Sequence, residues 1–490
     1  MKHLNYIIML VCFAFLSAST VLFAQQQEWV EKMEDPEANF YDIQQSFNEY
    51  WDGREVSKGS GWKPFKRWEY FMEPRVYPSG KIPRPDATAK AMRAYRASGA
   101  KTNSSADWQP LGPSQWNEGF GWNPGIGRIN CSVVDPQNPN KIYIGAPSGG
   151  FWRTSNGGQT WETTTDNLPV LGVTAIVIDP TDSDIIYIGT GDGDAGDTYS
   201  IGVLRSTDGG TTWQTTGLNW DISQTRRISK MLIDPGNANV LLAATNNGVY
   251  KSVDSGANWT RTATGNFKDI EFKPGDPSTV YAAGRTFLRS TNGGDSFNQI
   301  TQGVPPSVQV IRFAIAVTPA NPNYVYILAG NQSAGFLGLY RSDNSGASFT
   351  TRSTSPNILG YAPDGSTSGG QAWYDLAIAV STTDAEEVYT GGVNIWKSVN
   401  GGASWNINAY WFYPNQSIAY VHADIHSLDF HETLGGAALY AGSDGGLWST
   451  NDSGNNWTEL SQGIETSQFY RFSNSPIDPG LIIGGTQDNG

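Results

Sequence analysis

Short apolar runs alternate with turn residues through most of the chain. The first of them spans residues 129–134, and others follow at residues 141–145, 150–154 and 161–165. Pro, Gly, Asn and Asp stand between these runs, as in the pair Asp135-Pro136. Runs of this length that are rich in β-branched and aromatic residues and bounded by turn formers predict β-strands. This stretch therefore predicts four strands in succession.

The same order of strands returns along the chain, and one turn sequence marks each return. Its pattern is Ser/Thr-x-Asp/Asn-x-Gly-x-x-Trp/Phe, as in residues 206–213. The Asp or Asn side chain can accept hydrogen bonds from the turn's own backbone, the Gly allows a positive φ, and the aromatic ring can pack on neighbouring residues. Copies at such spacing indicate a repeat architecture. They end at Trp161, Trp213, Trp259, Phe297, Phe349, Trp405 and Trp457.

This turn resembles the Asp-box, also called the BNR repeat, of sialidases, xyloglucanase-like glycoside hydrolases and sortilin-like receptors. The resemblance covers residues 108–490 and implies an all-β fold, a β-propeller of four-stranded antiparallel blades. In those families the motif joins the third and fourth strands of a blade. A fold of this kind hosts many unrelated activities, so the resemblance predicts architecture better than function.

Seven complete repeats are expected, followed by an incomplete eighth. Its first two strands are expected at residues 469–472 and 481–485, and neither a third strand nor the turn follows before residue 490. We therefore expect the propeller to be truncated at its C-terminal end. Residues 108–112 resemble a fourth-strand segment, and we expect them to supply the outer strand of a closing blade, which would cover an exposed edge.

The N-terminal end predicts export. Residues 1–24 combine Lys2, an apolar run at residues 6–16 and a small residue, Ala24, in the pattern of a secretory signal peptide. The expected location is extracellular or at the surface of a bacterium, and no other stretch is apolar enough for an integral membrane segment. After removal of the leader Cys131 is the one cysteine left, which excludes an intramolecular disulfide.

Residues 25–107 lack the repeated turn and are expected to form a helical and extended arm with a linker at residues 101–106. Asp35-Pro36 is a helix start, and a second helix is expected at residues 86–98. Between them the basic, aromatic residues 61–71 leave two alternatives. They form either an extended arm whose aromatic side chains pack on the propeller or a binding patch.

Blade geometry predicts where a site would lie. In a four-stranded antiparallel blade, the start of the first strand and the loop between the second and third strands lie on one face. The repeated turns lie on the opposite face, so we expect their Asp residues to be structural. Loops on a rigid scaffold are common places for binding and catalysis. The expected site face carries Arg128, Asp192, Asp194, Asp197, Arg226, Arg227, Arg312, Tyr374, Asp375, Asp444, Tyr470, Gln487, Asp488 and Asn489.

All histidines beyond the predicted leader fall within residues 422–431. On a strand, His422, Asp424 and His426 would point to the same side, and that side would face the central channel. Three alternatives remain open: a hydrogen-bonded polar network, a site for zinc or another transition metal, or acid–base chemistry by a histidine.

The loop at residues 191–197 is rich in carboxylates. Asp192 and Asp194 could contribute to a calcium site, although the loop lacks the acidic residue that closes an EF-hand. The alternative is a plain turn.

Two functions follow from these patterns. The first is a secreted propeller that recognises a glycan or protein ligand with Arg227, Tyr374, Asp375, His422, Asp424, His426 and Tyr470. The second is a glycoside hydrolase acting on a polysaccharide, which needs two carboxyl groups about 5–10 Å apart. Its candidate catalytic residues are Asp192, Asp444 and Asp488.

Other functions are disfavoured. The net charge of −14 argues against a general nucleic-acid binder. Sialidases have an Arg-Ile-Pro near the start of the propeller, where this chain has Arg128-Ile129-Asn130, and their three-arginine clamp has no counterpart that we can assign. Peptide binding like that of sortilin-like receptors is disfavoured, because the cysteine-rich module that follows the propeller in those receptors is lacking here.

Overall fold

The structure is a computed structural model and describes residues 28–35, 37–56, 61–98, 110–116, 123–413, 417–433, 436–478 and 480–489. The predicted signal peptide and the predicted linker lie outside the described residues. The chain divides into two compact units, Met1–Ala100 and Lys101–Gly490. No helix among the described residues is long and apolar enough to cross a membrane.

The first unit is helical. Its α3 presents Phe40, Ile43 and Phe47 at helical spacing on one buried face, as the sequence predicts. The side chain of Asn39 accepts a hydrogen bond from the backbone of Tyr41 and so caps the helix. The helices are α2 (Glu28–Glu34), α3 (Phe40–Trp51), α4 (Trp62–Val76) and α5 (Ala87–Ala97).

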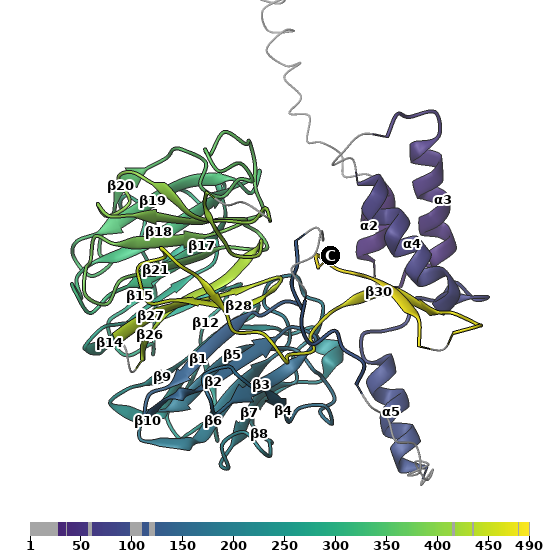
Figure 1. The fold of residues 1–490 in the computed structure, drawn as a ribbon, viewed down its shortest axis with the longest axis horizontal. Coiled ribbons are helices and arrows are strands. Elements are labelled where there is room, and N and C mark those ends of the chain that lie inside the picture. Colours follow the sequence, from purple (N-terminus) through teal and green to yellow (C-terminus); the bar gives the residue numbers. More distant parts are fainter. Residues whose placement is uncertain are drawn as a thin grey trace, which may run out of the picture. The chain divides into compact units, whose positions relative to one another are not determined.

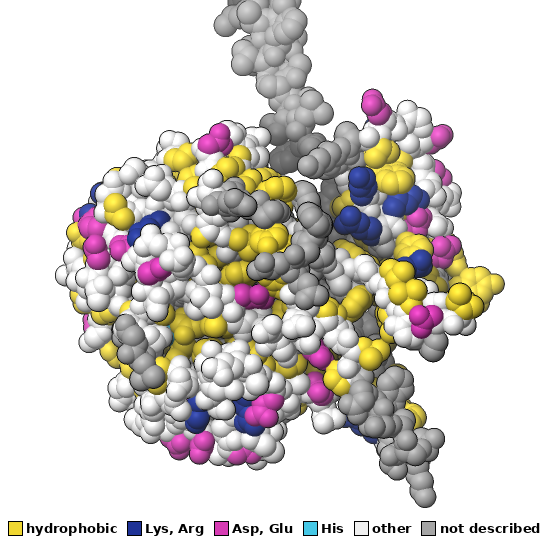
Figure 2. All heavy atoms as spheres, viewed as in Figure 1, with side chains coloured by type: hydrophobic (Ala, Val, Ile, Leu, Met, Phe, Trp, Pro, Cys, Tyr) yellow, Lys and Arg dark blue, Asp and Glu magenta, His cyan; other side chains and the backbone are white. Residues whose placement is uncertain are grey.

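The basic, aromatic stretch is helical, and the prediction of an extended arm is wrong. Trp62, Phe65 and Trp68 recur at a spacing of three residues, which places them on one face of α4. Phe65 is buried and its ring stacks on that of Phe47 at 3.6 Å between centroids. These rings therefore form the core of the helical unit itself, while basic side chains gather on its surface (Figure 2).

The second unit contains seven blades within the described residues, each with its strands in chain order and with four antiparallel strands, to which one blade adds a fifth strand (Figure 1). The predicted all-β propeller of four-stranded antiparallel blades is confirmed. The first three blades contain β1 (Cys131–Asp135), β2 (Asn138–Ala146), β3 (Gly150–Thr154), β4 (Glu162–Thr163); β5 (Val173–Asp179), β6 (Asp182–Thr190), β7 (Gly202–Ser206), β8 (Gln214–Asn219); and β9 (Ile228–Asp234), β10 (Asn237–Thr245), β11 (Gly248–Ser252), β12 (Thr260–Ala263).

The remaining blades follow the same order, and blade 6 has a fifth, parallel strand, β25. A two-stranded antiparallel pair, β30–β31, follows blade 7 at the place predicted for the eighth repeat. The strands are β13 (Asp269–Lys273), β14 (Asp276–Ala283), β15 (Phe287–Ser290), β16 (Asn298–Gln299); β17 (Val310–Val317), β18 (Val325–Asn331), β19 (Phe336–Ser342), β20 (Thr350–Ser353); β21 (Ala377–Val380), β22 (Val388–Gly391), β23 (Ile395–Ser398), β24 (Asn406–Tyr410), β25 (Ala419–Tyr420); β26 (Ile425–Thr433), β27 (Gly436–Ser443), β28 (Gly446–Thr450), β29 (Thr458–Glu459); and β30 (Phe469–Asn474), β31 (Ile482–Thr486).

The repeated turn joins the third and fourth strands of every blade. In the second copy, Asp208 Oδ1 accepts from the backbone N–H of Thr211 at 3.0 Å and of Thr212 at 2.8 Å, and Ser206 Oγ accepts from Gly210 N at 2.8 Å. The Gly at the fifth position has a φ between +77° and +89° in all seven copies. Only Gly adopts that conformation without strain, which explains its presence in the pattern.

The ring closes through the same contact that links its blades. Trp213 Nε1 donates to Thr164 Oγ1 of the preceding blade at 3.2 Å, and Trp161 Nε1 donates to the backbone oxygen of Leu460 in blade 7 at 2.8 Å. Ile129 N also donates to Ser443 O at 2.9 Å. The expectation that residues 108–112 supply an outer strand is wrong for the described part, residues 110–112, which is not a strand. Blade 7 builds all four of its strands from residues 425–459.

Replacing Trp213 with Ala is expected to lower the free energy of unfolding by about 2 kcal/mol, less than for a fully buried Trp because the ring is half-buried. The ring lies edge-on against Phe151 of blade 1 at 5.0 Å, so the substitution opens a gap between two blades. Chemical denaturation measures the loss. Trp213→Phe should retain most of the stability, and an unchanged midpoint in Trp213→Ala would contradict the role of this ring.

Candidate functional site

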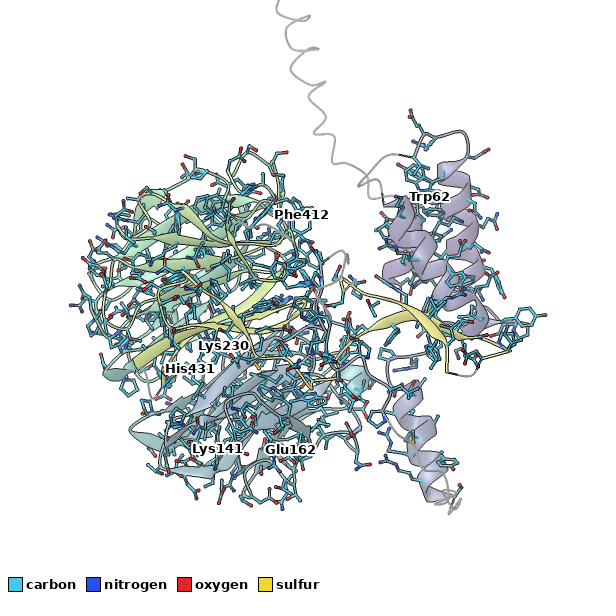
Figure 3. The ribbon with its side chains drawn as sticks, viewed as in Figure 1. Trp62, Lys141, Glu162, Lys230, Phe412 and His431 are labelled. Carbon is cyan, nitrogen blue, oxygen red and sulfur yellow. The ribbon has the colours of Figure 1, made fainter. Side chains whose placement is uncertain are left out.

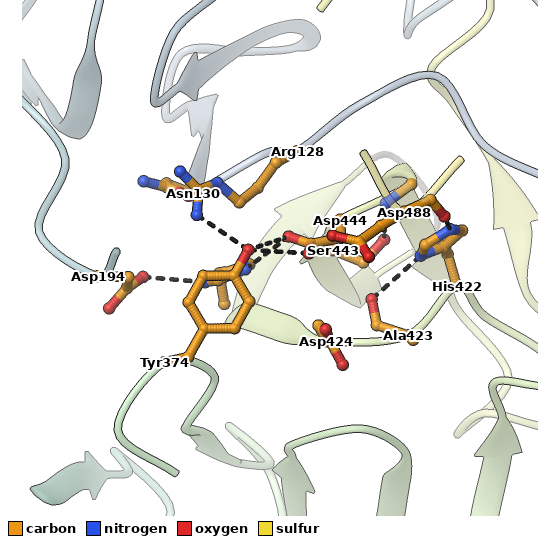
Figure 4. A network of polar contacts seen from close by, with 12 residues as sticks. Arg128, Asn130, Asp194, Tyr374, His422, Ala423, Asp424, Ser443, Asp444 and Asp488 are labelled. Carbon is orange, nitrogen blue, oxygen red and sulfur yellow. Dashed lines mark hydrogen bonds and ion pairs between the residues drawn. The ribbon is translucent and has the colours of Figure 1, made fainter. Parts of the chain in front are cut away.

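One end of the central channel carries a hydrogen-bonded polar network (Figure 4). It combines residues next to the first strands of blades 1, 5, 6 and 7 with the loops between second and third strands in blades 2 and 7. This is the face that blade geometry predicts for a site. The network residues are Arg128, Asp192, Asp194, Arg312, Tyr374, His426 and Asp444.

His426 lies at the centre of the network. Its Nδ1 is 2.9 Å from Asp194 Oδ2 and its Nε2 is 2.9 Å from Asp444 Oδ1, and the side chain is fully buried. Burial alone would lower the pKa of this imidazole. Its hydrogen bonds to the two carboxylates, together with their charges, outweigh burial and raise the pKa to about 9. At neutral pH the ring is therefore a cation held between two anions.

Asp444 is a buried carboxylate whose oxygens are both hydrogen-bonded within the protein. Tyr374 Oη lies 2.8 Å from Asp444 Oδ2, and Arg128 Nη1 donates to Tyr374 Oη at 2.9 Å. Burial raises the pKa of Asp444, but the hydrogen bond and charge of His426, then Arg128 and Tyr374, bring it below its usual value. Burial and the charge of Asp444 raise the pKa of Tyr374. Asp444 is thus ionised, and its hydrogen-bonding capacity is taken up by the protein.

Asp192 organises the loop between β6 and β7. It is fully buried, and its two oxygens accept from Arg128, Asn130 and the backbone N–H groups of Asp194, Gly196 and Asp197. This arrangement is that of a turn-forming carboxylate. The neighbouring Asp194 pairs with Arg312 Nη1 at 2.8 Å. Burial opposes ionisation of Asp194, but Arg312 and His426 lower its pKa.

The described residues contain no group of three or more His, Cys, Asp or Glu side chains that could hold a metal ion. The histidine cluster does not converge on one point as the metal hypothesis required. His422 Nε2 lies 3.0 Å from the backbone oxygen of Asp488, Asp424 accepts from Gln371, and His426 faces Asp194 and Asp444. The arrangement is that of a polar network around the Asp444 turn.

The prediction that His422, Asp424 and His426 point to the same side of one strand is wrong, because β26 begins at Ile425. Asp424, directly before it, has a φ of +65°, a left-handed conformation that disfavours residues other than Gly. The turn separates the directions of His422, Asp424 and His426. Asp488 has a similarly strained φ of +58°. Strain of this kind clusters at functional sites.

Asp424 and Asp488 lie around the Asp444 turn and retain access to solvent. Asp424 is half-buried and Asp488 is exposed. Burial and then the charge of Asp444 raise the pKa of Asp424 to about 7, although His426 and a 2.9 Å hydrogen bond from Gln371 Nε2 oppose that rise. Burial and the charge of Asp444 also raise the pKa of Asp488. The ionised Asp444 therefore favours the protonated form of both.

Asp375 is buried close enough to Asp424 and Asp444 to feel their charges. Neither of its carboxyl oxygens accepts a hydrogen bond from the described residues. Burial and the charges of Asp424 and Asp444 raise its pKa well above the ordinary value, which favours its protonated form.

Of the other predicted ligand-binding residues, Arg227 lies beside this network, and Tyr470 lies in the two-stranded pair that follows blade 7. Arg227 packs on the β6–β7 loop, where a Cβ at Gly196 would come within 2.2 Å of its Nη1. Tyr470 is exposed on β30. Two residues earlier, Gln468 Nε2 donates to Ser148 Oγ at 3.0 Å.

Sequence reasoning missed the aromatic side chains of two long connections on this face. The connection from β20 to β21 presents Tyr361 and Trp373, 44% and 50% exposed, and the one after β24 presents Phe412, 38% exposed (Figure 3). Trp411 Nε1 donates to the backbone oxygen of Tyr361 at 3.1 Å, which joins the two connections. The signal was available, because the largest spacing between repeated turns, from Phe349 to Trp405, contains the first connection.

A cavity of about 330 Å³ continues from the network down the channel. Lys230, labelled in Figure 3, lies there with its Nζ 2.9 Å from Asp269 and bonded to Glu271. Burial opposes the charge of Lys230, but the two carboxylates raise its pKa. Burial raises the pKa of Glu271 to about 7 although Lys230 opposes it. Asp194, Arg312 and His426 of the network line this cavity, as does Lys268.

Comparison with known proteins finds no matching family model. The xyloglucanase of Paenibacillus sp is 26% identical over 402 residues, which cover 77% of this chain and 35% of that protein. Xyloglucanase Xgh74A of Acetivibrio thermocellus is 25% identical over 365 residues, 63% of this chain and 41% of that protein. The chain thus spans about two fifths or less of the length of these curated relatives.

Solved structures give the same picture of the fold. The GH74 xyloglucanase from Xanthomonas campestris aligns with a TM-score of 0.55 at 16% identity, covering 75% of this chain and 59% of that one. The GH74 enzyme of Niastella koreensis aligns with a TM-score of 0.53 at 18% identity, covering 76% and 59%. The propeller fold resembles that of GH74 xyloglucanases.

Proposed function

We propose that this chain is a secreted glycoside hydrolase that cleaves a polysaccharide of the xyloglucan type at the channel mouth. The observation that carries the proposal is the set of carboxyl groups gathered there, of which Asp444 is held ionised while the more accessible Asp424 is held protonated. Glycosidases need a carboxylic acid and a carboxylate with separated pKa values. The xyloglucanase relatives favour hydrolysis over simple ligand recognition.

Asp424 is the proton donor in this proposal. With a pKa of about 7 it carries its proton at mildly acidic pH, and it gives that proton to the leaving-group oxygen. Gln371 positions the carboxyl through its 2.9 Å hydrogen bond. The left-handed backbone at Asp424 holds the group away from the strand that follows.

Asp488 is its partner, acting as base or nucleophile. It is the exposed carboxyl of the group, and its backbone oxygen is fixed by His422 at 3.0 Å. The two more deeply placed candidates have other roles. Asp444 supplies the fixed charge that favours the protonated form of Asp424, and Asp192 holds the β6–β7 loop.

The exposed rings of Trp373 and Tyr361 supply a surface for the sugar chain. Sugar rings stack through their C–H faces on flat aromatic side chains, which bury apolar area with little loss of conformational freedom. Both rings stand on the connection that also carries Gln371 and Tyr374. A chain lying on them would therefore pass close to Asp424.

Incubation with xyloglucan and with unbranched β-glucans, followed by measurement of new reducing ends, tests the proposal. We expect xyloglucan to be cleaved. Binding of xyloglucan without any new reducing ends would contradict hydrolysis and support the alternative, a propeller that recognises a glycan. Absence of both cleavage and binding across the panel would show that these glycans are neither substrates nor ligands of the protein, and would contradict the proposal.

A further inference from the structure

Basic side chains stand at the entrance of the first strand in five of the seven blades. They are Arg128 in blade 1, Arg227 in blade 3, Lys268 in blade 4, Arg312 in blade 5 and His426 in blade 7. Because first-strand entrances meet around the channel, these cations surround its mouth. The whole chain carries a net charge of −14, so such a gathering is not a consequence of composition.

Carboxylates neutralise three of the five cations. The pairs are Arg128 with Asp192 at 2.9 Å, Arg312 with Asp194 at 2.8 Å, and His426 with Asp194 and Asp444, each at 2.9 Å. Asp197, which is exposed, also pairs with Arg128, at 3.0 Å. The carboxylates of the β6–β7 loop therefore pair with basic side chains of blades 1, 5 and 7.

Arg227 and Lys268 have no such partner. Neither forms a salt bridge with any carboxylate in the part of the chain that the structure describes. Lys268 Nζ donates to the backbone oxygen of Gly193, and Arg227 lies against Gly196, so both cations rest on one loop without a salt bridge to it. Burial and the charges of Arg312 and Arg227 lower the pKa of Lys268 to about 8, although the charges of Asp194 and Asp192 oppose that fall. This sector of the mouth therefore has an excess of positive charge.

We propose that Arg227 and Lys268 form a subsite for a carboxylate of the bound glycan, and that the substrate class includes polysaccharides with uronic acid residues. This inference rests on the proposed function, because it places the subsite in blades 3 and 4, beside the mouth where the glycan would be cleaved. A guanidinium with free donors binds a carboxylate through paired, charge-assisted hydrogen bonds. The strongly negative chain disfavours a dense polyanion such as a nucleic acid, whereas sparse carboxylates on a sugar chain meet only this local positive sector.

The experiment is a binding comparison between matched probes, by calorimetry at low temperature. The probes are glucuronoxylan oligosaccharides and oligogalacturonides, each compared with its carboxyl-reduced, neutral form. We expect at least one acidic probe to bind wild-type protein about tenfold more tightly than its neutral form, a preference that falls as salt is added. Arg227→Gln should remove the preference by weakening the acidic probe and leaving the neutral one unchanged.

A matched control removes one positive charge from the far end of blade 4, the blade of Lys268. Lys273 ends β13, the strand that Lys268 precedes, and therefore lies at the opposite end of the blade. Lys273→Gln should keep the wild-type preference. If Arg227→Gln fails to fold, Lys268→Gln takes its place with the same expected result.

Each other outcome overturns the inference. Equal affinity for the acidic and neutral probes, or no binding of either acidic probe, removes the subsite. Equal weakening of both probes in Arg227→Gln would show that Arg227 only supports the β6–β7 loop. Failure here is distinct from failure of the proposed function, because cleavage of neutral xyloglucan would persist without a carboxylate preference, and a carboxylate preference without cleavage would leave the subsite standing.

Discussion

Asp424→Asn is expected to reduce the rate of polysaccharide cleavage by about 10²–10⁴-fold, the range attributed to a general acid. Asparagine keeps the shape of the side chain and can accept the hydrogen bond from Gln371, but it has no proton to give. The fold should be retained, since the group is half-buried and removing its charge lowers repulsion from Asp444. Initial rates of reducing-end formation, at matched thermal stability, measure the effect.

The control is Asp364→Asn on the β20–β21 connection, which also carries Gln371. Asp364 is a carboxylate that accepts local hydrogen bonds from Ser366, whose backbone N lies 3.0 Å away, so its loss should leave the rate unchanged. Wild-type activity should also fall as pH rises through about 7, because Asp424 then loses its proton. A variant Asp424→Asn with wild-type activity would exclude this residue as the proton donor.

His426→Ala is expected to lower the free energy of unfolding by about 3–5 kcal/mol, the cost of removing one partner from a buried ionic network. The substitution leaves Asp194 and Asp444 facing each other across an empty space. Arg312, Arg128 and Tyr374 then remain to offset the two buried negative charges. His426→Gln, which keeps a hydrogen-bond donor, should lose less. Chemical denaturation at pH 7 measures both, and a loss below about 1 kcal/mol in His426→Ala would contradict the cationic role of this ring.

The same ring predicts a pH dependence of stability. Its folded-state pKa, about 9, lies above the unfolded value of 6.5, so its contribution is complete below pH 6.5 and is lost as pH rises through 9. The shift corresponds to roughly 3 kcal/mol. The raised pKa of Asp424 makes stability fall as pH rises toward about 7. The lowered pKa of Lys268 makes stability rise with pH above about 8. The difference between wild-type and His426→Gln profiles isolates the histidine, and parallel profiles would contradict its raised pKa.

The sequence predicted the blades and the face of the site because both follow from local rules. The repeated turn requires a Gly with positive φ and a short Asp or Asn side chain, so each copy marks one third-to-fourth strand connection. Antiparallel order then fixes which loops share a face. That is why Asp194, Asp444 and Tyr374, which are far apart in the chain, could be expected together before any contact was known.

The details that periodicity misjudged depend on single residues and on tertiary packing. A left-handed turn at Asp424 ends the alternation that was expected to align His422 with His426. The stretch around Trp62 is helical because its rings find partners such as Phe47 within the helical unit. The protonation states of Asp424 and Asp375 depend on burial beside Asp444, which the sequence alone does not contain.

The most direct test of the central claim is a structure of Asp424→Asn bound to a xyloglucan oligosaccharide long enough to span the mouth. The account predicts sugar rings stacked on Trp373 and Tyr361, with one glycosidic oxygen within hydrogen-bond distance of residue 424 and the adjacent anomeric carbon facing Asp488. An oligosaccharide bound on the face of the repeated turns, or across the mouth with no glycosidic bond between residues 424 and 488, would contradict it.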